Sequence, residues 1–154
     1  MKLPEDYKAS LLVHNGTNTR IFSLFHSHDY ISHKQVIQEW EDHKCTGTGT
    51  GTGTGMDPED DVESDVPEFK GRLYWYTKWI PFTDDGFGQH YFVDLNPTSK
   101  GTVGQVGSFD RDVGVDELLA GSFYQFFSNY VRDVYCGKYR VEKWGLSNID
   151  YCNS

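Results

Sequence analysis

The segment WIPFTDDGFGQHYFVDLNPTSKGTVGQV, residues 79–106, places runs of aromatic and β-branched residues between two groups of turn residues. Runs of this composition are typical of strands, because such side chains pack well on a pleated surface. Asp84-Asp85-Gly86 predicts a hairpin connection, and residues 96–101 predict the next turn. Strands joined by short turns run antiparallel, so this segment predicts an antiparallel meander. With the residues that flank it, four strands are expected, at residues 21–25, 73–82, 90–95 and 102–109.

Two helices are predicted before the meander. The first covers residues 4–14, because Pro4 suits a first helical turn and Gly16 can adopt the positive φ that follows a last turn. The second covers residues 33–44; it opens after Ser32 and carries Gln35 three residues further on, which is the spacing of a capping box.

A third helix is predicted after the meander. Ser122 and Gln125 form a second capping box, and large apolar residues then recur at helical spacing from Phe123 to Val134, with Gly137 after the end. An apolar stripe of this kind must pack against a core. The elements together predict an α+β fold, in which an antiparallel meander sheet packs with N-terminal and C-terminal helices.

The composition indicates one globular domain that does not bind nucleic acid. A chain of 154 residues buries about 70% of its unfolded surface, enough for one core. The net charge of −9 argues against nucleic acid, which requires clustered Lys and Arg.

Three cysteines without a C-x-x-C pair indicate a reducing compartment. An acidic N-terminus and the lack of a long apolar run predict a cytoplasmic protein with no targeting segment and no membrane contact. The oligomeric state does not follow from the sequence.

An insert of low complexity interrupts the predicted domain at about residues 45–70. It contains five Thr-Gly pairs at residues 46–55, followed by seven acidic residues between Asp57 and Glu68. Outside this acidic run the chain has 16 acidic and 14 basic residues, so the rest of it is close to neutral. One interpretation is the expansion of a tolerated surface loop, since long insertions cost little free energy. The other is an acidic arm that attracts a basic partner. The domain is expected to span residues 1–141, with a tail at residues 142–154.

Three motifs, in order along the chain, resemble the SUKH superfamily and within it the Smi/Knr type. Residues 3–16 carry a Leu-Pro-x-x-Tyr helix that ends in Asn-Gly. Residues 79–106 carry WIPF, DDG-x-G, VDL-x-P and G-x-x-GQV, and residues 120–139 are similar to the last helix of the family. The resemblance covers most of the chain outside the insert and the tail. Two features depart from it: Gln89 stands where the family often has an acidic residue, and many members have a further helix before the Leu-Pro motif.

The resemblance implies a protein that binds another protein and catalyses no reaction. Bacterial members are known chiefly as immunity proteins, and fungal members regulate cell-wall assembly. The first functional interpretation is therefore an immunity protein that binds and neutralises a toxin of the nuclease or deaminase type. The alternative is a regulatory or scaffolding module, such as a regulator of cell-wall assembly or of signalling. No cofactor is expected in either case.

Six aromatic or acidic residues of the predicted sheet and its turns are candidate contacts for a protein partner: Trp75, Tyr76, Trp79, Asp84, Asp85 and Asp94. Large rings anchor partners at low entropic cost, and carboxylates complement the basic surface of a nuclease. Each candidate also has a structural interpretation. Strand alternation places Trp75 and Trp79 on one face and Tyr76 on the other, so at most one of these sets belongs to the core. The aspartates are also common hydrogen-bond acceptors in turns.

The histidines could support a different function, but their spacing does not complete a metal site. His26, His28 and Asp29 lie close in sequence to His33 and His43, yet no further ligand motif follows them. We expect solvated loop histidines, with His33 and His43 on the polar face of the second helix. A metal-dependent hydrolase is the least favoured interpretation. The sequence contains no nucleophile elbow and no phosphate-binding loop, so neither a catalytic residue nor a metal ligand is predicted.

Overall fold

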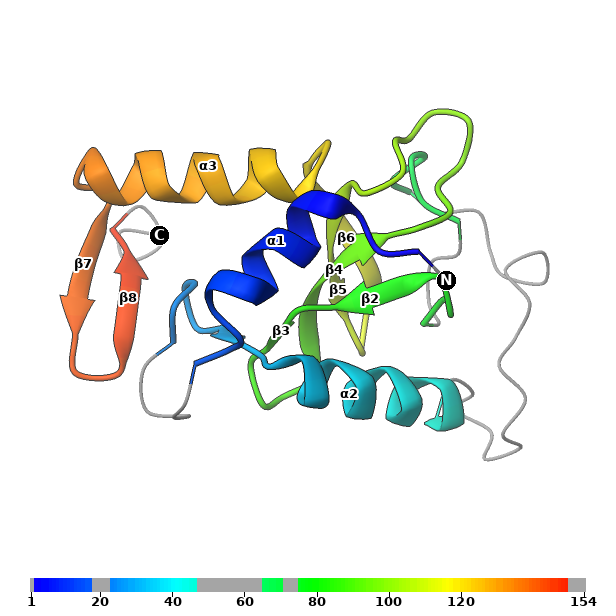
Figure 1. The fold of residues 1–154 in the computed structure, drawn as a ribbon, viewed down its shortest axis with the longest axis horizontal. Helices are drawn as coiled ribbons and strands as arrows, with labels where there is room; N and C mark the ends of the chain where they lie inside the picture. Colours follow the sequence, from blue (N-terminus) through cyan, green and yellow to red (C-terminus); the bar gives the residue numbers. More distant parts are fainter. Residues whose placement is uncertain (1, 18–22, 47–64, 71–74, 150–154) are drawn as a thin grey trace.

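The computed structural model describes residues 2–17, 23–46, 65–70 and 75–149. Three helices and eight short strands follow one another along these residues (Figure 1), so the α+β prediction is confirmed. Their bounds are α1 Glu5–Val13, β1 Asp29–Tyr30, α2 His33–Thr46, β2 Trp79–Pro81, β3 Thr83–Asp84, β4 Gln89–Asp94, β5 Val106–Asp110, β6 Gly114–Ala120, α3 Phe123–Tyr135, β7 Tyr139–Glu142 and β8 Gly145–Asn148. The Thr-Gly pairs from residue 47 onward and most of the acidic run lie outside the described residues.

The central sheet has four antiparallel strands in the order β2-β4-β5-β6. Trp79 pairs with Asp94, and Gln89 pairs with Asp110, which sets the register across β2, β4 and β5. This is the predicted meander, with the predicted turns between its strands. Two further antiparallel pairs accompany it, β1 with β3 and β7 with β8.

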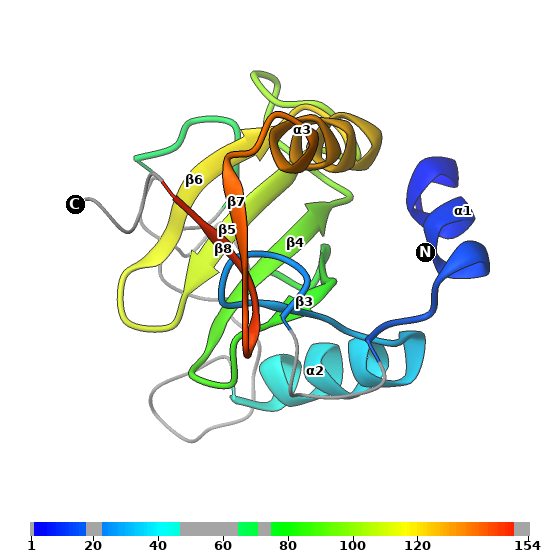
Figure 2. The same ribbon diagram turned by 90° about the vertical axis from the view of Figure 1, so that its left-hand side faces the viewer.

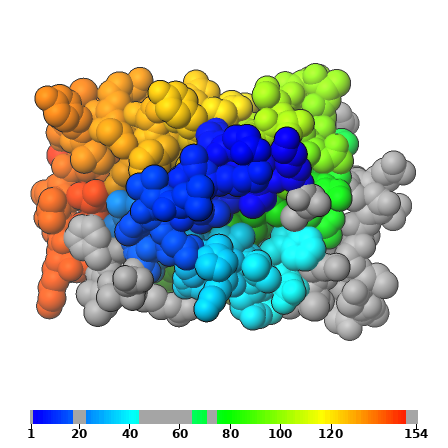
Figure 3. Space-filling model, in the orientation of Figure 1, coloured from blue at the N-terminus to red at the C-terminus, as the bar shows by residue number. Residues whose placement is uncertain are grey.

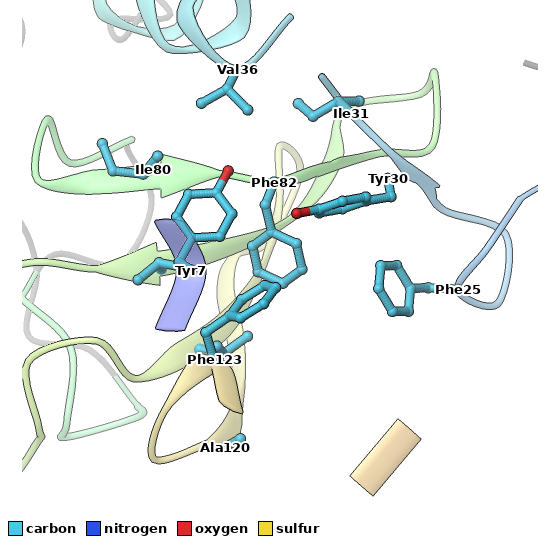
Figure 4. Close-up of a cluster of buried hydrophobic side chains, with 11 residues drawn as sticks. Tyr7, Phe25, Tyr30, Ile31, Val36, Ile80, Phe82, Ala120 and Phe123 are labelled. Atoms are coloured by element: carbon cyan, nitrogen blue, oxygen red, sulfur yellow. The ribbon is translucent and has the colours of Figure 1, made fainter. Parts of the chain in front are cut away.

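One face of the sheet, called here the helix side, packs against all three helices. Figure 1 shows α1 between α2 and α3 with the sheet behind it, and Figure 3 shows the same helices covering this face. Figure 2 shows the hairpin of β7 and β8 at one end of the sheet, below α3. The core on this side contains mostly aromatic rings, and Figure 4 labels its main members. Tyr7 of α1, Phe82 and Phe123 of α3 are buried together, with ring centroids 5.0–6.1 Å apart. Of the apolar stripe predicted for α3, Phe123, Phe126 and Tyr130 therefore face the core, whereas Phe127 and Val131 are 38% and 49% exposed.

The opposite face of the sheet, called here the loop side, packs against residues 65–70 and 75–79. Alternation along β4 places Val93 on the helix side and Phe92 on the loop side. On the loop side Trp79 is fully buried and stacks on Phe92, with 4.5 Å between ring centroids. Gly107 of β5 lies under these rings, because a Cβ there would come within 2.6 Å of Phe69. The sheet thus has two aromatic cores, one on each face.

The predicted helix ends agree with the structure. The Ser122 hydroxyl accepts a hydrogen bond from the Gln125 backbone N–H at 3.1 Å, and the side-chain oxygen Oε1 of Gln125 accepts one from the Gly121 N–H. The Ser32 backbone N–H donates to the Gln35 side chain in the same manner at the start of α2. These contacts satisfy N–H groups that have no partner within the helix.

Several predicted strands differ from those observed. Residues 75–78 of the predicted strand 73–82 form no ladder, because the chain turns at Thr77 and Lys78 and the Trp79 N–H donates to the Tyr76 carbonyl. Of the predicted strand 21–25, the described residues Ser23 and Phe25 form only isolated bridges. Strands β6, β7 and β8 were not predicted. The hairpin of β7 and β8 occupies part of the segment expected to be a tail, and Ser23 lies against it through a bridge to Gly145.

Candidate functional site

The three aromatic candidate contacts are buried. Trp79 has no exposed surface, Trp75 has 5% and Tyr76 has 9%. All three belong to the core on the loop side, since residues 75–78 are not extended and strand alternation does not separate them. The expectation that only one of the two sets is core was therefore wrong. Buried rings offer no contact area to a partner, so these residues act in packing.

Asp94 is also buried, and its partners belong to this chain. One carboxylate oxygen accepts from the Gln105 side chain at 3.0 Å, and the other accepts from the Asn96 N–H at 2.9 Å. Gln105 also donates to the Glu68 carbonyl. Burial raises the pKa of Asp94 to about 6, although these hydrogen bonds and Lys70 lower it in part. Asp94 therefore ties the turn after β4 to residues 65–70 and does not face a partner.

Asp84 and Asp85 are partly exposed, but both carboxylates bond to the hairpin turn. Asp84 accepts from the Gly86 N–H at 2.8 Å, and Asp85 accepts from the N–H groups of Phe87 and Gln89 at 2.7 Å and 2.9 Å. The turn interpretation accounts for these contacts. Whether the two carboxylates also contact a partner stays a prediction.

The histidine set considered from the sequence does not come together around one point. His33 is exposed and bonds to Asn15, whereas His28 is buried and stacks on Tyr91 with 4.2 Å between ring centroids. His28 is therefore not a solvated loop residue, and burial lowers its pKa. His43 does not lie on a polar face either, since its ring stacks on Trp75 at 4.3 Å.

A cleft of about 610 Å³ opens on the helix side of the sheet, beside the part that the helices cover. Its floor comes from β4, β5 and β6, and its walls come from α3, the loop at residues 25–28 and the hairpin of β7 and β8. Figure 2 shows these elements around the end of the sheet. Apolar and aromatic side chains in the lining include Phe25, Tyr91, Leu119, Phe126, Tyr130 and Tyr139. The Tyr130 hydroxyl donates to the Leu24 carbonyl, which holds α3 against the loop.

The charged groups of the cleft are mostly acidic. Four carboxylates line it and one arginine, Arg132, opposes them; the carboxylates are Asp110, Asp116, Glu117 and Asp133. Asp133 forms ion pairs with Arg132 and Lys138 at 3.5 Å and 3.2 Å. Hydrogen bonds from the Asp112 N–H and the Gln89 side chain lower the pKa of Asp110, so it is ionised at neutral pH. Asp116 and Glu117 are exposed, and no ion pair between described residues includes them. We call this surface the acidic cleft.

Sequence reasoning missed the acidic cleft because it missed β6. The strand reads GVDELLA, and its Asp and Glu are depleted in strands. Its pairing with β5 also contains two register shifts, so its residues do not alternate regularly between the two faces. The glycine at position 114 is the sequence signal that could have marked the start of β6, because its φ of 87° belongs to a turn.

The outer side of α3, away from the sheet, carries exposed apolar side chains. Tyr124 is 71% exposed, Val131 is 49% exposed and Tyr135 is 92% exposed. They recur at helical spacing, so they share one side of the helix. Exposed apolar groups that lie together on a helix are common at protein interaction sites.

Comparison with known proteins identifies a family. The model of the SMI1/KNR4 family (SUKH-1) matches residues 1–129. A glucan synthesis regulatory protein of Neurospora crassa is 23% identical over 174 aligned positions, covering 92% of this chain and 32% of that protein. The cell wall assembly regulator SMI1 of Saccharomyces cerevisiae is 29% identical over 79 positions, covering 51% of this chain and 16% of the regulator.

A third relative, KNR4/SMI1 homolog 2 of Debaryomyces hansenii, is 30% identical over 70 positions, covering 46% of this chain and 12% of that protein. The chain therefore aligns with less than a third of each of these relatives. The names of two of them describe regulators. Among the described residues, no helix combines the length and the apolar character that crossing a bilayer requires.

Proposed function

Because the chain belongs to the SMI1/KNR4 family (SUKH-1), we propose that it is a non-catalytic regulatory module that binds another protein and acts in the control of cell-wall assembly. Two of its relatives are fungal regulators of cell-wall assembly or glucan synthesis. They favour the regulatory alternative over the neutralisation of a toxin, which was the first interpretation of the sequence. A partner protein is the ligand in this proposal.

The acidic cleft is the observation that carries the binding part of the proposal. It combines aromatic walls with carboxylates, and Asp116 and Glu117 at its floor strand are exposed. Aromatic rings supply contact area, and unpaired carboxylates attract cations and raise the rate of association. A segment of a partner that carries Lys or Arg beside apolar residues matches both properties.

A binding experiment tests the chemistry of the cleft. The probe is a fluorescent peptide that alternates Lys with Leu, and the matched control peptide alternates Glu with Leu. Fluorescence anisotropy should show binding of the Lys peptide only, with affinity that falls as salt increases. The double variant Asp116→Lys/Glu117→Lys should weaken binding about tenfold or more, mainly through the association rate. Glu41→Lys, which makes half of that charge change on the exposed surface of α2, should have little effect. Equal losses in both variants would exclude the cleft as the site.

A genetic experiment tests the regulatory role separately. A chimera carries this chain in place of the matching segment of the Saccharomyces cerevisiae regulator, in a strain that lacks the native protein. We expect the chimera to restore growth under cell-wall stress and the Asp116→Lys/Glu117→Lys chimera to restore it less. A stably expressed chimera without any rescue would contradict the proposed role in cell-wall assembly, even if the purified domain bound the peptide.

A further inference from the structure

Three potential metal ligands come together where α2 meets the edge of the sheet. Glu39 and His43 are four residues apart on α2, so they lie on the same side of the helix. His90 comes from β4, 47 residues after His43 in the sequence. One ligand atom from each of the three side chains lies within 4.8 Å of the others. This group shares only His43 with the set considered from the sequence.

The hydrogen bond of His90 prepares its other nitrogen for a ligand. His90 is buried, and its Nδ1 lies 2.8 Å from the Thr83 carbonyl oxygen. A carbonyl oxygen only accepts, so Nδ1 carries the proton in this contact. In neutral His90 the lone pair is then on Nε2. A backbone carbonyl that orients a histidine in this way is the usual support of a metal-binding imidazole.

His43 has a buried nitrogen that no other described residue contacts through a hydrogen bond. Among the described residues, its Nε2 is buried and has no hydrogen bond. Its ring is held by stacking on Trp75, and its centroid lies 4.6 Å from that of His90. A buried nitrogen without a partner costs free energy, which a bound ion would recover.

We propose that Glu39, His43 and His90 form a binding site for a divalent transition-metal ion of the zinc type. Two imidazole nitrogens and one carboxylate oxygen are a donor set that Zn²⁺ accepts, with a water completing four ligands. Bond lengths of about 2.0–2.2 Å place tetrahedral ligands about 3.4 Å apart. The present separations, up to 4.8 Å, must shorten toward that value when an ion binds. The ion links α2 to β4.

The competing explanation is that His43 is only a packed ring between Trp75 and His90. The two explanations differ for His43→Phe, which keeps a flat ring on Trp75 but removes the nitrogen. If the ring is only packed, His43→Phe and the wild type should respond to added metal in the same way. If it is a ligand, the variant loses metal binding while its fold and its stability without metal remain close to those of the wild type.

Titration of the purified, metal-free chain with Zn²⁺ tests the site, with Co²⁺ as a second probe because its visible absorption reports coordination by nitrogen and oxygen. We expect one ion per chain, a rise in the thermal midpoint on Zn²⁺ addition, and quenching of tryptophan emission by Co²⁺ because Trp75 contacts His43. Calorimetry should show the same stoichiometry. Absence of one-to-one binding by the wild type would overturn the proposal.

Matched variants on α2 assign the ligands. His43→Phe and Glu39→Gln should each lower Zn²⁺ affinity by more than the roughly tenfold loss that follows removal of a supporting hydrogen bond. His33→Gln and Glu41→Gln change exposed residues of the same helix and should bind as the wild type does. Circular dichroism confirms that each variant is folded before titration. Equal affinity in His43→Phe and His33→Gln would show that the bound ion is elsewhere.

Discussion

The two faces of the central sheet use similar residues for different purposes. On the loop side, Trp75 and Trp79 pack in a closed core from which solvent is excluded. On the helix side, beyond the part covered by α1 and α2, the sheet opens into the acidic cleft with aromatic walls. From the sequence, Trp75 and Trp79 were candidate contacts for a partner because large aromatic rings often anchor one. The comparison shows that the identity of an aromatic residue does not distinguish an anchor from a core residue, because burial depends on which segments cover the strand.

The largest effect is expected on the loop side. Trp79→Ala should lower the free energy of unfolding by about 3–5 kcal/mol, because it leaves a cavity among Phe69, Trp75 and Phe92. Urea denaturation measures the loss. Trp144→Ala removes a side chain that is 64% exposed and should change stability by no more than about 0.5 kcal/mol. Similar losses in the two variants would contradict the assignment of Trp79 to the core.

The next effect is a pH dependence that arises from Asp94 on the same side. Burial raises its pKa from 3.8 to about 6 in the folded state, so folding favours the protonated carboxyl. Its contribution to stability is therefore complete below about pH 3.8 and is lost as the pH rises through about 6, by up to about 3 kcal/mol.

The comparison that isolates this contribution is with Asp94→Asn, which does not titrate. As the pH rises over that range, the unfolding free energy of the wild type should fall relative to that of Asp94→Asn. Urea denaturation at a series of pH values measures this change. Glu41→Gln, an exposed change, controls for general charge effects. A constant difference between wild type and Asp94→Asn would mean that Asp94 ionises in the folded protein as it does in the unfolded chain.

A smaller effect is expected where α3 begins above the helix side. Ser122→Ala removes the hydroxyl that accepts from the Gln125 N–H and should cost about 1 kcal/mol. Hydrogen exchange should increase in the first turn of α3 and remain unchanged around Trp79. Ser128→Ala, at an exposed position within the same helix, should not destabilise it. An equal increase in exchange on both faces would show that the two cores unfold as one unit.

The smallest effect concerns the floor of the acidic cleft. Asp116→Lys/Glu117→Lys should change the free energy of unfolding by no more than about 0.5 kcal/mol, since both side chains are exposed. The measurement is urea denaturation at low and high salt. A loss of several kcal/mol would mean that these carboxylates support the fold, and any loss of binding in this variant would then have a structural cause.

Elements with strong local signals could be predicted from the sequence. The capping boxes at Ser32 and Ser122 and the turn at Asp84-Asp85-Gly86 depend on residues within four positions of one another. By contrast, β6 carries acidic residues and two register shifts, so its pairing with β5 does not produce a regular pattern. Residues 75–78 have strong strand composition but turn back, because packing around Phe69 and Phe92 outweighs propensity. Of the six candidate contacts, only Asp84 and Asp85 reach the surface.

The sequence alone determined the fold class, the meander and the three helices, because caps, turns and apolar periodicity act over a few residues. It also indicated the family, through the resemblance of its three motifs. Only the tertiary structure decided which aromatic rings are covered, where the acidic cleft opens, and that Glu39 and His43 lie beside His90. These features depend on contacts between residues far apart in the chain. Such contacts follow from the way the helices and loops cover the two faces of the sheet, which no local pattern encodes.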